Sequence, residues 1–256
     1  NTYKAASTDA TIKATKKITG KELVADAYTF ELKEKDTDKV VATAKNTASG
    51  EVVFNVNYTE AGEHTYTITE KAGTEAGVTY STESYTVKVN VVDNGQGQLV
   101  ATVDEAERVF TNTYKAAETK ATITATKVLN GKALEADKYE FELKEGNKVV
   151  ATAKNAADGT VTFPAISYDA AGPHTYTITE KAGSEAGVTY DTATHEVTVN
   201  VTDNGQGQLE AAVAGNNPTF TNTYKAAKTS ATITAKKVLE GKALEADKYE
   251  FELKEG

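Results

Sequence analysis

A six-residue segment, Asn-Thr-Tyr-Lys-Ala-Ala, occurs three times and divides the chain into repeats. Its copies lie at residues 1–6, 112–117 and 222–227, so their spacings are 111 and 110 residues. Longer stretches are copied as well: residues 64–80 match residues 174–190 at 16 of 17 positions. Residues 131–146 are identical to residues 241–256. Self-similarity at a fixed period indicates tandem structural units.

The repeat spacing predicts how the chain is divided into domains. We expect the tail of a preceding repeat (1–7), two full repeats (8–117 and 118–227) and the opening strands of an incomplete third (228–256). This division indicates a slice of a longer array. The linkers, residues 115–120 and 225–229, contain neither Gly nor Pro, and flexible linkers are usually richer in Gly and Ser. We therefore expect domains arranged end to end with limited hinge freedom.

Within each repeat, short runs of alternating polarity separated by Gly, Asn and Asp predict β-strands. In the second repeat the predicted strands are residues 121–129, 138–144, 148–154, 160–163, 174–181, 195–202, 208–213 and 219–224. Short antiparallel strands at this density are typical of an Ig-like β-sandwich. Frequent Thr, Val and Tyr also favour an all-β fold. At most a single helical turn is expected, at residues 132–137.

Composition excludes several classes of function. The chain has no Cys, so disulfides and thiolate metal sites are excluded. A net charge of −9 argues against a nucleic-acid partner, which requires a basic surface. The chain contains no apolar run of membrane-spanning length and no signal peptide, so we expect no membrane insertion. No cofactor motif is present, and we expect neither a cofactor nor a bound metal.

The segment Asp-Asn-Gly-Gln-Gly occurs at residues 93–97 and again at 203–207. One interpretation is a tight hairpin turn, for which Asn-Gly is a typical sequence. The other is a calcium-binding loop. The segment lacks the spaced carboxylates that a calcium site requires, so the pattern favours the hairpin.

Strand alternation places a Lys, a Glu and an Asn on core-facing positions of three strands in each repeat, because side chains of a strand alternate between its two faces. In the first repeat these faces are Ile12, Ala14 and Lys16; Tyr66, Ile68 and Glu70; and Phe110, Asn112 and Tyr114. In the second they are Ile123, Ala125 and Lys127; Tyr176, Ile178 and Glu180; and Phe220, Asn222 and Tyr224. Three polar residues on apolar faces, in each of the two repeats, require a chemical explanation.

Burial lowers the pKa of a lysine and raises that of a carboxyl group. A neutral amine is a nucleophile, and a protonated Glu can hydrogen-bond an amide carbonyl and transfer protons. We therefore predict isopeptide bonds Lys16–Asn112 and Lys127–Asn222, with Glu70 and Glu180 as the catalytic residues. Each bond forms once, so the chain is not a turnover enzyme. The alternative is a buried Lys–Glu ion pair with Asn capping a strand.

Two residues of these types are expected to stay unpaired. Lys237 matches Lys16 and Lys127, but no matching Glu or Asn follows it in this sequence. Asn1 matches Asn112 and Asn222, but no matching Lys or Glu precedes it. Neither residue is expected to react within this chain.

The segments Thr-Lys-Val-Leu-Asn-Gly, Tyr-Thr-Ile-Thr-Glu-Lys and Phe-Thr-Asn-Thr-Tyr follow in this order in the second repeat. Together they resemble the isopeptide-linkage domains of streptococcal-type major pilins, and similar tandem modules occur in large wall-anchored adhesins of Gram-positive bacteria. The resemblance implies a β-sandwich related to the collagen-adhesin B-type domain, with the cross-link joining the first and last strands. It also implies the same roles for the two Lys–Glu–Asn sets.

The expected function is structural: a stalk module of a bacterial pilus or adhesin, extracellular and on the cell wall or in a surface fibre. Its expected partners are neighbouring repeats of the same array or fibre. The alternative is an adhesin module that binds host-surface ligands, which predicts loops that differ between repeats. The loops after Glu70 and Glu180 are nearly copied instead. This copying favours a spacer.

Overall fold

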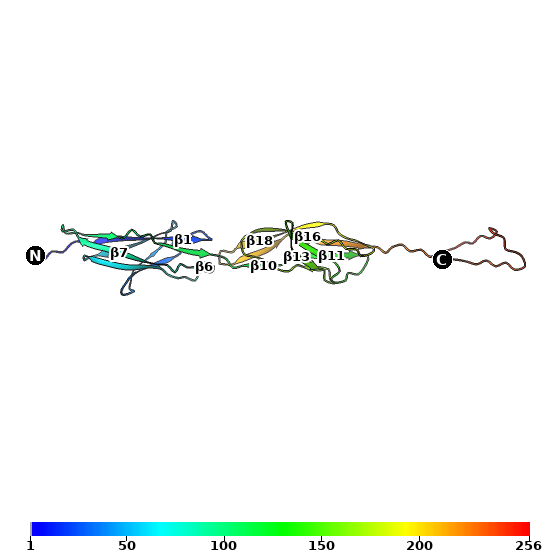
Figure 1. Ribbon diagram of the computed structural model, residues 1–256, viewed down its shortest axis with the longest axis horizontal. Helices are drawn as coiled ribbons and strands as arrows, with labels where there is room; N and C mark the ends of the chain where they lie inside the picture. The colour runs from blue at the N-terminus through cyan, green and yellow to red at the C-terminus, as the bar shows by residue number, and fades with distance from the viewer. Residues whose placement is uncertain (1) are drawn as a thin grey trace.

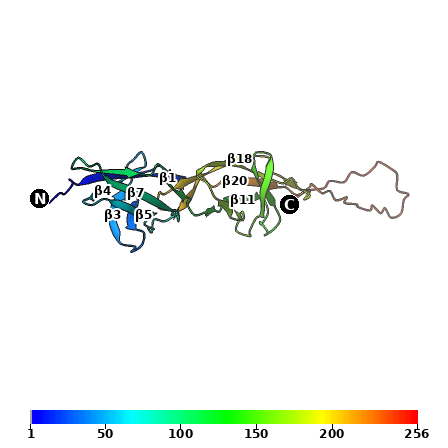
Figure 2. The ribbon, with the colours of Figure 1, turned by 60° about the vertical axis from the view of Figure 1, so that its left-hand side comes forward.

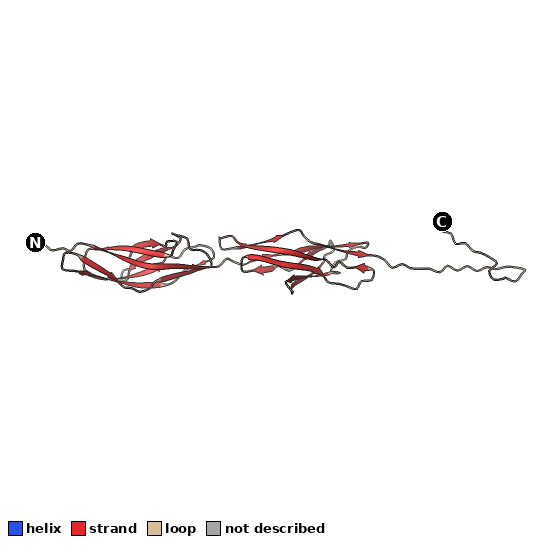
Figure 3. Cartoon of the chain, turned by 90° about the horizontal axis from the view of Figure 1, so that it is seen from above, coloured by secondary structure: helices blue, strands red, loops and turns tan. Residues whose placement is uncertain are grey.

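The computed structural model describes residues 2–256 and is built from β-strands, with no helix in that range. Two β-sandwiches follow one another along an elongated molecule (Figures 1 and 3). We call strands β1–β9 the first sandwich and strands β10–β20 the second sandwich. The all-β prediction is confirmed. The single helical turn expected at residues 132–137 is wrong: Asp137 has φ 61°, which is outside the helical region.

The first sandwich consists of two sheets. Its strands are β1 (Thr8–Thr19), β2 (Thr29–Glu34), β3 (Val40–Lys45), β4 (Glu51–Tyr58), β5 (Gly62–Glu70), β6 (Val78–Thr79), β7 (Ser84–Asp93), β8 (Leu99–Val103) and β9 (Val109–Tyr114). One sheet has the order β4-β1-β9-β6 and the other the order β3-β2-β5-β7-β8. Lys16 and Asn112 therefore belong to one sheet, and Glu70 belongs to the sheet that faces it.

The second sandwich repeats this arrangement. Its strands are β10 (Thr119–Ala121), β11 (Thr124–Asn130), β12 (Glu140–Glu145), β13 (Lys148–Lys154), β14 (Thr160–Thr162), β15 (Ile166–Tyr168), β16 (Gly172–Glu180), β17 (Val188–Thr189), β18 (Thr194–Asp203), β19 (Leu209–Ala214) and β20 (Thr219–Tyr224). The sheets are β14-β11-β20-β17 and β13-β12-β16-β18-β19, with a short β10-β15 pair beside them.

The first strand of the second sandwich is interrupted. The sequence predicts one strand over residues 121–129, but the structure has β10 and β11, and residues 122–123 between them lie outside both strands. One backbone hydrogen bond remains there, from the Phe163 N–H to the Ile123 carbonyl at 3.0 Å. The partner strand carries Pro164 between β14 and β15. Proline has no N–H to donate to the ladder, so the pairing breaks on both strands. In the first sandwich β4 has no proline, and both β1 and β4 run without a break.

The first and last strands of each sandwich are parallel. The strand pattern predicts antiparallel strands throughout, which is wrong for this pair: β1 pairs with β9, and β11 with β20, in parallel register. Antiparallel neighbours follow naturally from hairpins, whereas parallel neighbours need a long crossover connection. Here the connection is the rest of the sandwich, so hairpin geometry does not dictate the direction of the closing strand.

Aromatic residues fill the space between the two sheets. The rings of Phe30 and Phe110 lie 5.2 Å apart in the first sandwich, and those of Phe141 and Phe220 lie 5.2 Å apart in the second. All four side chains are buried. Phe110 and Phe220 each precede the site Asn by two residues, so the alternation that buries the rings directs the Asn side chains into the same core.

Residues 228–256 extend beyond the second sandwich and contain turns but no strand (Figure 2). Ile233 and Phe251, whose counterparts are core residues in the sandwiches, are 70% and 64% exposed. In the first sandwich, β1 and β2 pair with β4, β9, β3 and β5. No copies of those partner strands follow residue 228 in this sequence. No helix among residues 2–256 has the length and apolar character needed to cross a membrane.

Candidate cross-linking sites

Strand register places each lysine next to the strand that carries its asparagine. Lys16 on β1 is directly opposite Phe110 on β9, and Asn112 is two positions further along. Lys127 has the same relation to Phe220 and Asn222. Positions two residues apart share a face of the strand. Lysine and asparagine therefore project from neighbouring strands into one core.

A glycine lets a turn approach the backbone of each lysine. The Lys16 N–H donates to the Gly50 carbonyl at 2.7 Å, and Gly50 has φ +90°. A Cβ at Gly50 would lie 2.2 Å from the Lys16 carbonyl oxygen. Gly159 repeats both features beside Lys127. Only glycine combines this φ with such a close approach.

Each glutamate forms a bridge between its lysine and its asparagine. In the first sandwich, Lys16 Nζ donates to Glu70 Oε2 at 2.8 Å and Asn112 Nδ2 donates to Glu70 Oε1 at 2.7 Å. In the second, Lys127 Nζ and Asn222 Nδ2 each lie 2.7 Å from an oxygen of Glu180. The Lys and Glu side chains are fully buried in both sites. One carboxylate thus holds an amine and an amide nitrogen side by side, away from water.

The carbonyl oxygen of each asparagine is bound by the backbone. The N–H of Ser81 donates to Asn112 Oδ1 at 2.7 Å, and the N–H of Asp191 donates to Asn222 Oδ1 at 2.7 Å. Because an N–H requires an acceptor, these bonds fix which end of the amide is oxygen. From the sequence, we expect the glutamate to polarise this oxygen. In the structure the glutamate faces the amide nitrogen, and a backbone N–H polarises the oxygen.

A tyrosine covers each lysine. Lys16 Nζ lies 4.6 Å from the centre of the Tyr28 ring, and Lys127 Nζ lies 4.8 Å from that of Tyr139. The Tyr28 N–H donates to Oδ1 of the buried Asn46 at 2.9 Å, which holds this loop against the core. Burial raises the pKa of Tyr28 and of Tyr139 to about 12. Both phenols are therefore neutral, and each ring closes its site as an apolar wall.

Alternation along strands does not indicate the tyrosines, Asn46 or the backbone donors, because all of them lie outside the three patterned strands. Repetition in the sequence does indicate the tyrosines and Asn46. The segment Ala-Asp-Lys-Tyr at residues 136–139 returns at 246–249, and Asn46 has a counterpart in Asn155. Ser81 and Asp191 differ in side chain, so a donor that uses only its backbone leaves no such trace.

The electrostatics of the sites favour a neutral amine. Burial lowers the pKa of Lys16 and of Lys127, while the hydrogen bond and the charge of the partner glutamate act in the opposite direction. A lysine and a glutamate held 2.7–2.8 Å apart can exchange a proton along their hydrogen bond. The arrangement can therefore present an unprotonated nucleophile beside an amide.

The other two residues singled out by the repeats lie outside these sites. Lys237 is exposed beyond the second sandwich, with Nζ 4.9 Å from the Tyr249 ring. Asn1 lies outside the residues that the structure describes. Lys237 thus repeats the lysine–tyrosine pair without the strands that bury it in the sandwiches.

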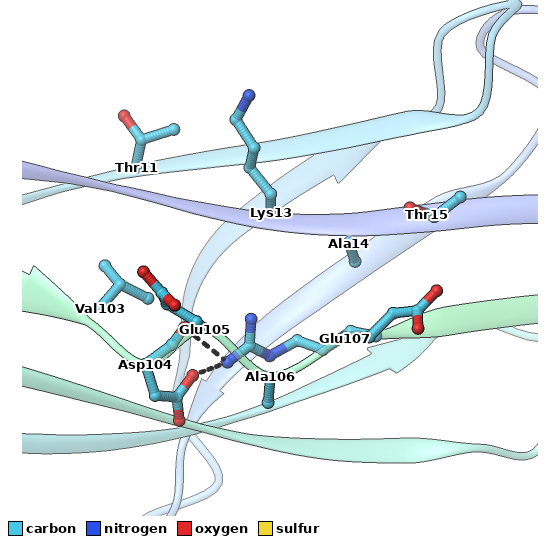
Figure 4. A pocket seen from close by; sticks show the side chains of 10 residues that line it. Thr11, Lys13, Ala14, Thr15, Val103, Asp104, Glu105, Ala106 and Glu107 are labelled. Atoms are coloured by element: carbon cyan, nitrogen blue, oxygen red, sulfur yellow. Dashed lines mark hydrogen bonds and ion pairs between the residues drawn. The ribbon is translucent and has the colours of Figure 1, made fainter.

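Some loops do differ between the repeats, as the ligand-binding alternative predicts, and one of them borders a hollow. In the first sandwich a hollow of about 320 Å³ lies between β1 and residues 103–108 (Figure 4). Two of its basic groups are paired: Arg108 forms an ion pair with Asp104, and Lys13 Nζ lies 2.7 Å from Glu51. In the second sandwich, Asn217 occupies the equivalent loop and bonds to β11. The other charged residues that line the hollow, Glu105 and Glu107, are both acidic.

Similar solved structures include pilins of several Gram-positive bacteria. The T-13 major pilin protein of Streptococcus pyogenes is 15% identical (TM-score 0.33, covering 86% of this chain and 98% of that one). GBS52, the minor pilin of Streptococcus agalactiae, is 12% identical (TM-score 0.29, 86% and 99%). BcpA, the major pilin subunit of Bacillus cereus, is 14% identical (TM-score 0.27, 84% and 69%). No curated protein sequence matches the chain.

A family model matches most of the chain. The model describes the Spy0128-like isopeptide containing domain, FctA, and it matches twice, at residues 12–115 and 123–225. The first match contains Lys16, Glu70 and Asn112, and the second contains Lys127, Glu180 and Asn222. The chain belongs to the Spy0128-like isopeptide containing domain family, of which it carries two copies.

Proposed function

We propose that each sandwich closes itself with one Lys–Asn isopeptide bond, Lys16–Asn112 in the first and Lys127–Asn222 in the second. The observation that carries the proposal is the carboxylate bridge: Glu70 and Glu180 each hold the lysine amine and the asparagine amide nitrogen on their two oxygens. The nucleophile and the leaving nitrogen are thereby held together before reaction. Holding reacting groups in place lowers the barrier substantially.

The reaction begins when the lysine ammonium transfers a proton to the glutamate. The neutral Nζ attacks Cγ of the asparagine, and the carbonyl oxygen becomes an oxyanion. The backbone N–H of Ser81 or Asp191 already donates to that oxygen, so it stabilises the charge as it develops. A preorganised donor of this kind contributes roughly 3–4 kcal/mol in acyl-transfer enzymes.

The glutamate then moves protons to complete the exchange. It gives its proton to Nδ2, which it already contacts, and it takes a proton from Nζ. The Cγ–Nδ2 bond breaks and one ammonia leaves. The new amide joins Nζ to Cγ, and the glutamate ends protonated. A neutral acid is cheaper to bury than a carboxylate, which favours the cross-linked state.

The alternative is that the lysine and glutamate form only a buried ion pair. Such pairs contribute little net stability because the desolvation of both charges offsets their attraction. In this alternative the asparagine only caps a strand, which does not require that its amide nitrogen and the lysine amine share one carboxylate, as they do in both sandwiches. Cross-linking uses every one of these contacts.

We infer that the chain forms part of the shaft of a Gram-positive surface fibre, outside the cell, with neighbouring repeats or pilin-like subunits as its partners. The family assignment supports this role, as does the end-to-end arrangement of the sandwiches (Figure 1). The bond forms once per domain, so the glutamates act in maturation and not in turnover. Binding to host-surface ligands has less support, because the loops after Glu70 and Glu180 are nearly copied between the repeats.

Mass spectrometry of the intact folded chain tests the cross-links. We expect a mass lower than that of the sequence by two molecules of ammonia, one for each bond. Peptide mapping should then recover branched peptides that join residue 16 to 112 and residue 127 to 222. An unmodified mass for folded protein would leave the buried ion pair as the correct interpretation.

A pH dependence of stability is expected for a chain with Glu70→Ala. The substitution removes both contributions that raise the pKa of Lys16 and leaves burial, which lowers it. Between that lowered pKa and the ordinary value of 10.5, the unfolded chain binds more protons than the folded one, so stability rises with pH. Thermal unfolding of the first sandwich should therefore shift to higher temperature as pH increases above neutral.

The matched control for this pH dependence is the double variant Glu70→Ala, Lys16→Met. Methionine keeps an unbranched apolar chain in the site but has no amine. The double variant should lose the rise in stability over the same pH range. An equal rise in both variants would assign the effect to groups other than Lys16.

A further inference from the structure

The two sandwiches meet at Tyr114, the last residue of β9. Its hydroxyl donates to Asp203 Oδ1 of the second sandwich at 2.8 Å, and it accepts from the N–H of Gly207 at 3.2 Å. The hydrogen bond to Asp203 raises the pKa of the Tyr114 phenol. Tyr114 therefore closes the first sandwich and is bound by the second.

The element that binds the Tyr114 hydroxyl is the Asp-Asn-Gly-Gln-Gly segment, whose sequence favours a hairpin. The hairpin is built by its own side chains: Asp203 Oδ1 accepts from the N–H of Gly205, and Asn204 Oδ1 accepts from the N–H of Gln206, both at 2.8 Å. These bonds hold the Asp203 carboxylate and the Gly207 N–H toward one phenol. We call residues 203–207, and their copy at residues 93–97, the Asp-Asn-Gly-Gln-Gly hairpin.

The linker backbone is bound on both sides of the joint. The Lys115 N–H donates to the Gly77 carbonyl of the first sandwich at 2.9 Å. The Ala117 N–H donates to Gly207 at 2.8 Å, and the Ala117 carbonyl accepts from Leu209 at 3.0 Å. The linker therefore leaves one sandwich and enters the other without a free segment between them.

Glycine is required where the hairpin contacts the first sandwich. A Cβ at Gly207 would lie 2.6 Å from the backbone carbon of Ala76, and one at Gly77 would lie 3.0 Å from the Gly207 Cα. Gly207 also has φ +82°. The two loops are thus packed backbone to backbone, which a side chain at either glycine would prevent.

The same joint recurs in the first sandwich, with the Tyr of the preceding Asn-Thr-Tyr-Lys-Ala-Ala segment. Tyr3 donates to Asp93 Oδ1 at 3.0 Å and accepts from the Gly97 N–H at 3.1 Å. The Ala6 N–H donates to the Gly97 carbonyl at 2.8 Å, as Ala117 does to Gly207. Each of the two copies of the hairpin therefore binds the copy of this segment that precedes it.

The exposed fractions of the three tyrosines show how much of the ring is buried by the preceding sandwich and how much by the following hairpin. Tyr3, which has a hairpin on one side only, is 64% exposed, whereas Tyr114, between two sandwiches, is 6% exposed. Tyr224, the third copy, rests on Gly187 of its own sandwich and is half-buried. No copy of the hairpin follows it in this sequence. Full burial of the ring thus needs both a sandwich and a following hairpin.

We propose that the Asp-Asn-Gly-Gln-Gly hairpin is a docking site for the tyrosine that closes the preceding repeat, and that this joint sets the angle between successive domains. The ligand of the site is a phenol hydroxyl presented by an extended Asn-Thr-Tyr-Lys-Ala-Ala segment. The end of the second sandwich at Tyr224 is, on the same grounds, a docking surface for a further repeat that carries this hairpin. The joint makes an array of such repeats stiff. It does not depend on isopeptide bond formation.

Distances between spin labels on the two sandwiches test the joint. The chain has no Cys, so Thr86→Cys on β7 and Glu196→Cys on β18 provide two exposed, equivalent labelling positions. The parent chain should give one narrow distance distribution. Tyr114→Phe removes only the hydroxyl, and Asp203→Ala removes its acceptor. We expect each to broaden the distribution roughly twofold, because small polar interfaces leave domains free to move.

The matched control is Asp93→Ala, the same substitution in the hairpin that binds Tyr3. It lies outside the labelled joint and should leave the distribution unchanged. An unchanged width in both Tyr114→Phe and Asp203→Ala would overturn the proposal, as would equal broadening in Asp93→Ala. Intact mass of the same samples reports the isopeptide bonds separately, so failure of one proposal is distinguishable from failure of the other.

Discussion

Replacing Glu70 with Gln is expected to leave Lys16 and Asn112 unjoined, while Lys127 and Asn222 in the same molecule still form their bond. Gln has the size of Glu and still hydrogen-bonds, but it cannot take a proton from the lysine or give one to the leaving nitrogen. Loss of a general acid–base group typically slows a reaction by about 10²–10⁴-fold. The intact mass should therefore show the loss of one ammonia instead of two.

The second sandwich provides the matched control for this experiment. Glu180→Gln should stop the second bond and leave the first, and the double variant should have the unmodified mass. Comparing Gln with Ala at each position separates proton transfer from packing, because only Ala opens a cavity. A bond that still forms at the normal rate in both Gln variants would show that the glutamates do not transfer the protons.

The same variants should be less stable as well as unlinked. By analogy with a disulfide that closes a loop of this length, one bond contributes about 4–5 kcal/mol to the free energy of unfolding. Without the bond, the lysine amine remains buried beside a neutral side chain, and an unpaired buried charge is itself destabilising. Thermal unfolding should show the mutated sandwich melting first and its intact neighbour melting later.

Much of the fold could be predicted from the repeats and the strand alternation. The predicted strands at residues 148–154 and 219–224 coincide with β13 and β20. The two-residue strand β17 and the short strand β15 were not predicted, because alternation needs about four residues to be recognised. The parallel pairing of β1 with β9 was also beyond the pattern, because direction depends on the path of the whole chain.

Some residues of the candidate sites could likewise be predicted from the sequence, and others could not. Side chains that must lie on a particular face, such as Lys16 and Asn112, follow from alternation. The N–H of Ser81 that binds the Asn112 oxygen does not, because every residue except proline has such a group. The hairpin at 203–207 is an intermediate case: its turn is encoded locally, but its phenol partner, Tyr114, belongs to the preceding sandwich.

Pulling on the two ends of the chain is expected to leave both sandwiches closed at forces that unfold an unlinked sandwich. Force enters the first sandwich through β1 and leaves through β9, which are parallel neighbours, so the load shears this pair. With Lys16 bonded to Asn112, the load passes through covalent bonds, and residues 17–111 are shielded from it. Without that bond, the hydrogen bonds between β1 and β9 would carry the load together until the pair separates.

Lys16→Met removes the covalent path and should reveal the hidden length. The 96 positions from residue 16 to residue 112 would extend by about 3.3–3.6 Å each, which gives a step of roughly 300–350 Å less the folded span. Lys127→Met should give a matching step from the second sandwich, and the double variant should give two. Single-molecule force spectroscopy measures these steps directly. A parent chain that releases the same length would mean that force in the shaft is carried by the hydrogen bonds of the sheet and not by a lysine–asparagine bond.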